Sequence, residues 1–141
     1  MSIATPPNPA ADPALSSGPI AGGPIGGGPI GGGQGAHFRG LESLYLSAPI
    51  NRLFESRLSI TAAGESRIEA MLDESHFHAA HAVHGTAYFK MLDDAAFYAA
   101  NSLLPDRFLL TTGCNLFFTR PLKPGPVVAE GRWLSGKKRV Y

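Results

Sequence analysis

The chain has 141 residues, a net charge of +1 and a single cysteine, Cys114. This length fits one domain at most, and the near-neutral charge gives no reason to expect nucleic acid or an anionic membrane as the main partner. One cysteine excludes an internal disulfide, and no apolar run approaches the roughly 20 residues of a membrane span. No basic residue precedes Arg39 and no apolar signal segment is present, so the sequence predicts a cytoplasmic protein.

Residues 1–36 form a segment dominated by Pro, Gly, Ala and Ser. Residues 18–32 repeat a five-residue unit, read as GPIAG, GPIGG and GPIGG. Such a segment has little apolar surface, so burial cannot offset the entropy cost of ordering its backbone. We therefore interpret it as a disordered leader and place the folded domain at residues 37–141.

The folded part begins with a helix and a β-hairpin. Residues 41–46 are apolar and predict a short helix that ends before Pro49. Residues 57–62 and 67–72 each alternate apolar and polar side chains, which is typical of half-buried strands, and Ala63-Gly64-Glu65 between them predicts a turn.

A long helix follows a His-rich loop. Residues 76–84 carry four histidines, and after His84-Gly85 no Gly or Pro interrupts the chain until Pro105. Many of these residues are good helix formers, and a helix that is apolar around most of its circumference is normally buried. Two adjacent carboxylates near its middle, Asp93 and Asp94, are costly in such a helix unless they are paired or used.

The remaining chain predicts further strands. Residues 110–118 alternate with period 2, with Cys114 as a buried thiol among them; residues 127–133 alternate again, and 137–141 begin a fifth strand. The order predicts an α+β fold in which one curved antiparallel sheet wraps around the long helix. We expect a last C-terminal strand to complete the sheet, and therefore interpret the sequence as truncated at its C-terminus.

The motif spacing resembles a known family. His84 is followed by Gly85, and Asp93 lies nine positions after His84. Two further motifs come later in the chain, YAANS at 98–102 and FFTRP at 117–121. This pattern is similar to hotdog-fold thioesterases of the phenylacetate-degradation (PaaI-like) type. The resemblance implies a hotdog fold assembled as homodimers or dimers of dimers, and hydrolysis of acyl-CoA or a related acyl thioester with no cofactor.

Thioester hydrolysis needs a group that activates water or attacks the carbonyl, and a donor that stabilises the oxyanion. The resemblance assigns the first role to Asp93, as general base or nucleophile, and the second to the Gly85 backbone N–H at the helix N-terminus. Asp94 is predicted to be solvated, capping or ion-paired. Gly85 and Asp93 are eight residues apart, or roughly 12 Å along one helix, so one carbonyl cannot meet both unless a second copy supplies one of them.

Some positions depart from the family pattern. His78 stands where the family has Asn or Gln, Thr86 replaces the second Gly and is expected to cap or start the helix, and Phe97 replaces a hydroxyl and is expected to shape an apolar acyl pocket. We predict substrate contacts at five residues: His78, His84, Thr86, Phe97 and Arg120.

Some alternatives stay open. The spacing of His76, His78, His81 and His84 could supply zinc ligands, although ordinary hydrogen bonds are expected and no metal is predicted. The basic run at 137–139 is either a solvated hairpin tip or a contact for coenzyme A phosphates; Arg120 has the same phosphate option, or pairs with a carboxylate such as Glu130. The alternative functions are a non-catalytic acyl-thioester-binding hotdog module and a hotdog dehydratase or hydratase.

Overall fold

The computed structural model describes residues 32–136, so the leader up to residue 31 and the fifth strand predicted at 137–141 lie outside the described residues. Helix α1 (Gly32–Ser47) begins before residue 37, where the sequence places the start of the domain. Its apolar residues Phe38, Leu41 and Tyr45 recur on one face and are buried. Helix α2 is a single turn, Pro49–Arg52, with the proline at its start.

The predicted hairpin is confirmed and carries a third strand. Strands β1 (Arg57–Ala62) and β2 (Glu65–Leu72) pair antiparallel, and β2 pairs antiparallel with β3 (Gly125–Arg132), giving the order β1-β2-β3. Alternate residues of these strands are buried on one face of the sheet. A short 3-10 turn, Glu74–His76, leads from β2 toward the helix α3.

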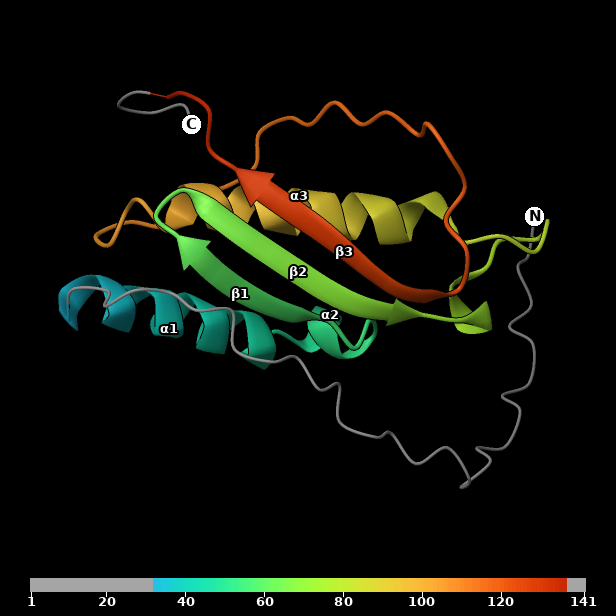
Figure 1. Cartoon of the computed structure of the whole chain (residues 1–141), viewed down its shortest axis with the longest axis horizontal. Helices are drawn as coiled ribbons and strands as arrows, with labels where there is room; N and C mark the ends of the chain where they lie inside the picture. Colours follow the sequence, from blue (N-terminus) through green and yellow to red (C-terminus); the bar gives the residue numbers. More distant parts are fainter. Residues whose placement is uncertain (1–31, 137–141) are drawn as a thin grey trace, which may run out of the picture.

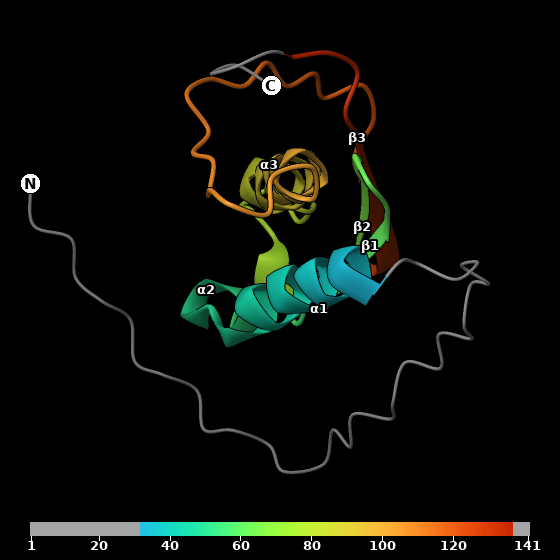
Figure 2. The same ribbon diagram turned by 90° about the vertical axis from the view of Figure 1, so that its left-hand side faces the viewer.

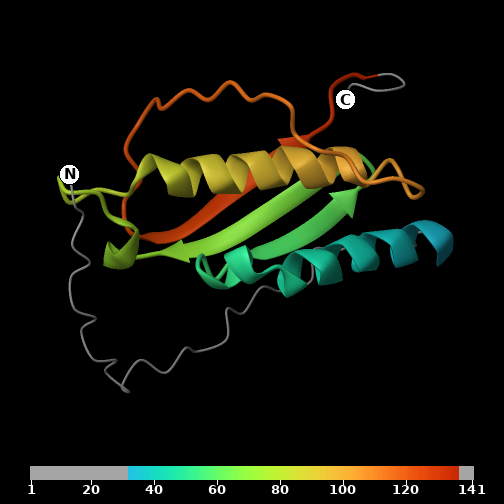
Figure 3. The same ribbon diagram turned by 180° about the vertical axis from the view of Figure 1, so that it is seen from behind.

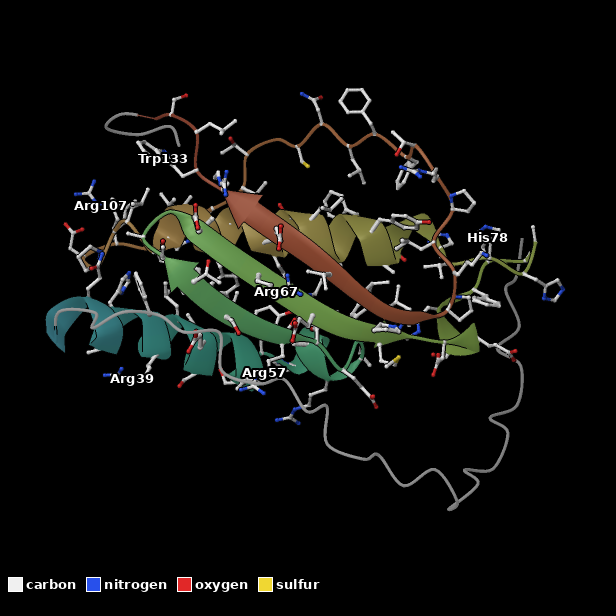
Figure 4. All side chains as sticks on the ribbon, viewed as in Figure 1. Arg39, Arg57, Arg67, His78, Arg107 and Trp133 are labelled. Atoms are coloured by element: carbon white, nitrogen blue, oxygen red, sulfur yellow. The ribbon has the colours of Figure 1, made fainter. Side chains whose placement is uncertain are left out.

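Both long helices lie on the same face of the sheet (Figures 2 and 3). Helix α3 (Gly85–Asn101) crosses β2 and β3, whereas α1 lies along β1 (Figure 1). The α1 side chain Glu42 accepts a hydrogen bond from the Ile60 N–H at 2.8 Å, so the helix also covers the outer edge of β1. The sheet face in front in Figure 4 carries Arg67, which forms ion pairs with both Glu69 and Glu130.

The helix α3 approaches the sheet closely because small residues meet there. Ala95 is fully buried, and its carbonyl oxygen accepts a hydrogen bond from Ser66 Oγ at 2.5 Å. Gly131 pairs with Ser66 across the two strands. The Ala95 carbonyl lies so close to Gly131 that no side chain would fit at this position. The sheet side of α3 is therefore buried, but Phe89 and Leu92 on its other side are exposed, so the prediction of a helix buried around most of its circumference is wrong for that side.

The strand predicted at 110–118 does not form. This stretch has no regular secondary structure, and the segment that contains it arcs around the side of α3 away from α1 (Figure 2). Alternation favours an extended chain, but a strand also needs a neighbour that satisfies its backbone groups, and none of residues 32–136 pairs with it. Cys114, predicted to be buried in that strand, is exposed for the same reason.

Candidate active site on helix α3

Helix α3 begins with a local cap built by His84. The backbone of His84 is extended, and its Nδ1 atom accepts a hydrogen bond from the Thr86 N–H at 3.1 Å. His84 is thus the N-cap, and Thr86, the second helical residue, sits at the helix start. Both side chains line a hollow of about 410 Å³ that also contacts Phe54 and His76.

Gly85 is the first residue of α3, where the backbone N–H groups point out of the helix. A β-carbon built on Gly85 would lie 3.2 Å from the ring of Phe118, which packs over it and contacts Tyr88 edge-on at 5.5 Å. The absence of a side chain therefore lets the Phe118 ring approach this N-terminus closely.

Asp93 faces a different environment from its neighbour Asp94. The Asp93 carboxylate is half-buried and accepts a hydrogen bond from the Thr111 hydroxyl at 3.0 Å. It opens into a hollow of about 260 Å³, lined among others by Asp93, Phe97, Leu109, Leu110, Thr111 and Cys114. A carboxylate in this setting has oxygen lone pairs available beside an apolar wall.

Asp94 is held in an ion pair with Lys90, one of the roles predicted for it. Burial raises the pKa of the Asp94 carboxyl above its usual range, and the Lys90 ammonium offsets part of that rise. Burial also raises the pKa of the nearby Tyr45 hydroxyl to about 12. Of the two adjacent carboxylates, Asp94 is thus committed to a partner within the fold and Asp93 is the one that faces the hollow.

Phe97 lies one turn beyond Asp93 and lines the same hollow, packing edge-on against Phe108 with ring centroids 5.1 Å apart. Phe97 thus contributes an apolar wall to this hollow. Phe108 itself is 53% exposed.

The other predicted site residues lie near the N-terminal end of α3. His78 is exposed in the loop before the helix (Figure 4), and its ring is 6.2 Å from that of His84. Arg120 is also exposed, and its carbonyl accepts a hydrogen bond from the Tyr88 hydroxyl at 3.4 Å, which places it near the same end. Within residues 32–136 Glu130 pairs with Arg67, and no ion pair joins it to Arg120.

The histidines of the loop do not gather into a ligand set. His76 contacts Asp73 at 3.0 Å, and no group of three or more His, Cys, Asp or Glu side chains within residues 32–136 is arranged to hold a metal ion. The basic run at 137–139 lies outside the described residues. No helix in the described part of the chain is long and apolar enough to cross a membrane.

Thr111 is the site residue that the sequence reasoning missed. It lies in an irregular segment 18 residues after Asp93, and neither its type nor its spacing marks it. Only the path of that segment over α3 brings the two side chains together. Phe118, which covers Gly85, was likewise predicted only as a strand residue.

Comparison with known proteins shows what this arrangement is similar to. Residues 80–140 match the model of the family described as the thioesterase superfamily. The E. coli PaaI protein from the phenylacetic acid degradation operon superposes with a TM-score of 0.61 at 17% identity, covering 69% of this chain and 70% of that chain. A thioesterase family protein from Silicibacter pomeroyi gives 0.61 at 18% identity, with the same coverage of 69% and 70%.

A phenylacetic acid degradation-related protein from Ralstonia eutropha JMP134 also gives a TM-score of 0.61, at 20% identity, covering 73% of this chain and 80% of that chain. A comparison with curated proteins found no significant match. The three-stranded antiparallel sheet, the long helix that it packs against and the family match agree with one another. Residues 80–140 are thus similar to the thioesterase superfamily, and the described residues have the hotdog fold of the three solved structures.

Proposed function

We propose that the protein hydrolyses acyl thioesters, with acyl-CoA as the substrate class. The observation that carries the proposal is the contrast between two adjacent carboxylates: Asp94 is paired with Lys90, while Asp93 opens into a hollow with an apolar wall. Such a carboxylate suits water activation next to an acyl group. The family match supports the reaction type, and a cytoplasmic location is part of the same proposal.

The reaction uses the helix N-terminus and the carboxylate together. The Gly85 N–H donates to the thioester carbonyl oxygen, aided by the partial positive charge of the α3 N-terminus. Asp93 takes a proton from water as the water oxygen adds to the carbonyl carbon. Collapse of the tetrahedral intermediate re-forms the C=O bond and breaks the C–S bond, and the departing thiolate takes up that proton. In the nucleophilic alternative the Asp93 carboxylate attacks the carbonyl carbon and the C–S bond breaks, which gives a mixed anhydride and a thiolate. Water then hydrolyses the anhydride to the free acid and the Asp93 carboxylate, and the proton released goes to the thiolate.

Two copies of the chain are needed for this chemistry. Gly85 and Asp93 stand on the same helix, eight residues apart, and are separated by roughly 12 Å along its axis. A homodimer that sets two α3 helices antiparallel brings the N-terminus of one beside Asp93 of the other. His78 and His84 border the carbonyl site, Thr86 lies beside them, Phe97 contacts the acyl group, and Arg120 reaches the phosphates of coenzyme A.

Mixed dimers test this arrangement. Gly85→Val adds a branched side chain where a β-carbon would already crowd Phe118, and Asp93→Asn removes the carboxylate, so each homodimer is expected to be inactive. Refolding the two variants together gives mixed dimers in which one site keeps both groups, and about a quarter of the wild-type thiol release should return at a one-to-one ratio. Recovery that never exceeds the sum of the two homodimers would contradict a shared site.

Thr111→Val is expected to lower kcat by about tenfold with little change in KM, because a hydrogen bond to a charged group contributes about 1.5–3 kcal/mol. The Thr111 hydroxyl holds one Asp93 oxygen, which leaves the other aimed at the hollow. Thr111→Ser should recover most of the rate, and Thr119→Val, an exposed residue of the same segment, serves as the matched control. Equal rates for Thr111→Val and Thr119→Val would remove Thr111 from the site.

A further inference from the structure

Lys90 has two carboxylates within reach on its own helix. Asp93 is three residues further along α3 and Asp94 is four, and both spacings allow a side-chain ion pair on a helix surface. The structure has the pair with Asp94. Something other than helix spacing therefore selects between the two carboxylates.

Four groups surround the Lys90 ammonium. Besides the Asp94 carboxylate, the ammonium donates to the Asn51 side-chain oxygen at 2.6 Å. It also lies 5.2 Å from the centroid of the Tyr45 ring and 5.8 Å from that of Phe54. These contacts hold the cation on the side of α3 that faces α1 and α2, where its side chain is only 15% exposed.

The surrounding groups are themselves fixed. The Asn51 amide donates to the Tyr45 carbonyl oxygen at 2.6 Å, and the Tyr45 hydroxyl is 2.6 Å from Ser56 Oγ. Asn51 and Ser56 are both buried. Tyr45 and Asn51 thus have partners of their own besides Lys90.

We propose that Tyr45, Asn51, Phe54 and Asp94 form a lysine cage that keeps Lys90 away from Asp93. An ammonium paired with Asp93 would occupy one of its oxygens and compete with the proton that the reaction transfers. The cage removes that competitor and leaves the carboxylate to Thr111 and the hollow. Asp94 is then a positioning residue that acts through Lys90, and this inference rests on the proposed role of Asp93 in thioester hydrolysis.

Asp94→Asn tests the cage by removing its one carboxylate. Asp93 is then the carboxylate left within a turn of Lys90, and kcat should fall about tenfold with KM within about twofold. The acid limb of the kcat/KM profile should also move to lower pH, as expected for a base that has gained a cationic partner. Adding Lys90→Met to Asp94→Asn removes the competing ammonium and should restore most of kcat and the position of the limb.

A purely structural role for the ion pair gives a different result. If the ion pair were only structural, the double variant would still regain stability, because an unpaired buried charge is removed. The acid limb of the kcat/KM profile would then stay in place in Asp94→Asn. Melting temperature and dimer content are therefore measured for every variant. Lys123→Met, at an exposed position, is the matched control for loss of a lysine. If Asp94→Asn folds poorly, Asp94→Glu, which keeps a carboxylate for the ammonium, should keep kcat within about twofold of the wild type and the acid limb in place, and a folded Asp94→Glu protein with a shifted limb would contradict the cage.

Two results would overturn the cage. One is an Asp94→Asn protein with wild-type kcat and an unmoved acid limb, and the other is a folded double variant as slow as the single one. Failure of the proposed function looks different: the wild type would not turn over, or Asp93→Asn would turn over as fast as the wild type.

Discussion

Asp93→Asn should lower the kcat of thioester hydrolysis by roughly 10²- to 10⁴-fold, the range that one general acid–base group contributes. The amide keeps the shape of the side chain and still accepts the Thr111 hydrogen bond, but it neither takes a proton from water nor attacks the carbonyl. Because little else changes, the variant should keep its fold and its dimer and should still bind substrate.

The measurement is thiol release from short, aromatic and long acyl-CoAs. Cys114 is exposed and reacts with thiol-detecting reagents, so only release beyond one equivalent per chain counts as turnover. Asp106→Asn is the matched control, since Asp106 is exposed and contacts Arg107 away from the hollow. A well-folded wild-type dimer that binds acyl-CoA without turnover would instead favour the binding module. A product that keeps its thioester would favour the hydratase.

Gly131→Ala should destabilise the fold by at least about 3 kcal/mol, at or above the upper end of the usual range for overpacking. A β-carbon at Gly131 would lie 2.1 Å from the Ala95 carbonyl oxygen and 2.3 Å from its carbon, so relief requires that β3 and α3 move apart. No rotamer change relieves a clash between two backbones. The loss is large against the 5–15 kcal/mol that a small domain has in total.

Urea unfolding, monitored by circular dichroism, measures this effect as a lower midpoint concentration of urea. The slope of the free energy of unfolding against urea concentration should stay constant. Gly40→Ala makes the same chemical change on the exposed side of α1, where nothing lies within 4 Å of the added carbon. It should stabilise the protein by about 0.5–1 kcal/mol, because alanine is the better helix former. Similar midpoints for the two variants would show that α3 does not pack on Gly131 as described.

Local signals in the sequence were enough for much of the fold. Period-2 alternation located β1 and β2, and the turn at Gly64 has the positive φ of 81° that favours glycine. The start of α3 after His84-Gly85 also matches the prediction, and the helix ends at Asn101, before Pro105. These features depend on neighbours a few residues apart, so the sequence contains most of the information that specifies them.

The sequence by itself therefore determined the hairpin, the long helix and the family resemblance, and it made Asp93 the candidate through its spacing to His84. Only the tertiary structure decided how residues 110–118 run, because a strand requires a partner that alternation cannot supply. The same holds for the contacts that distinguish two adjacent carboxylates: Thr111 reaches Asp93 and Asn51 reaches Lys90 across 18 and 39 residues of chain. Such pairs arise from the way α1, α2 and the segment after α3 pack around one helix, and no local pattern encodes that packing.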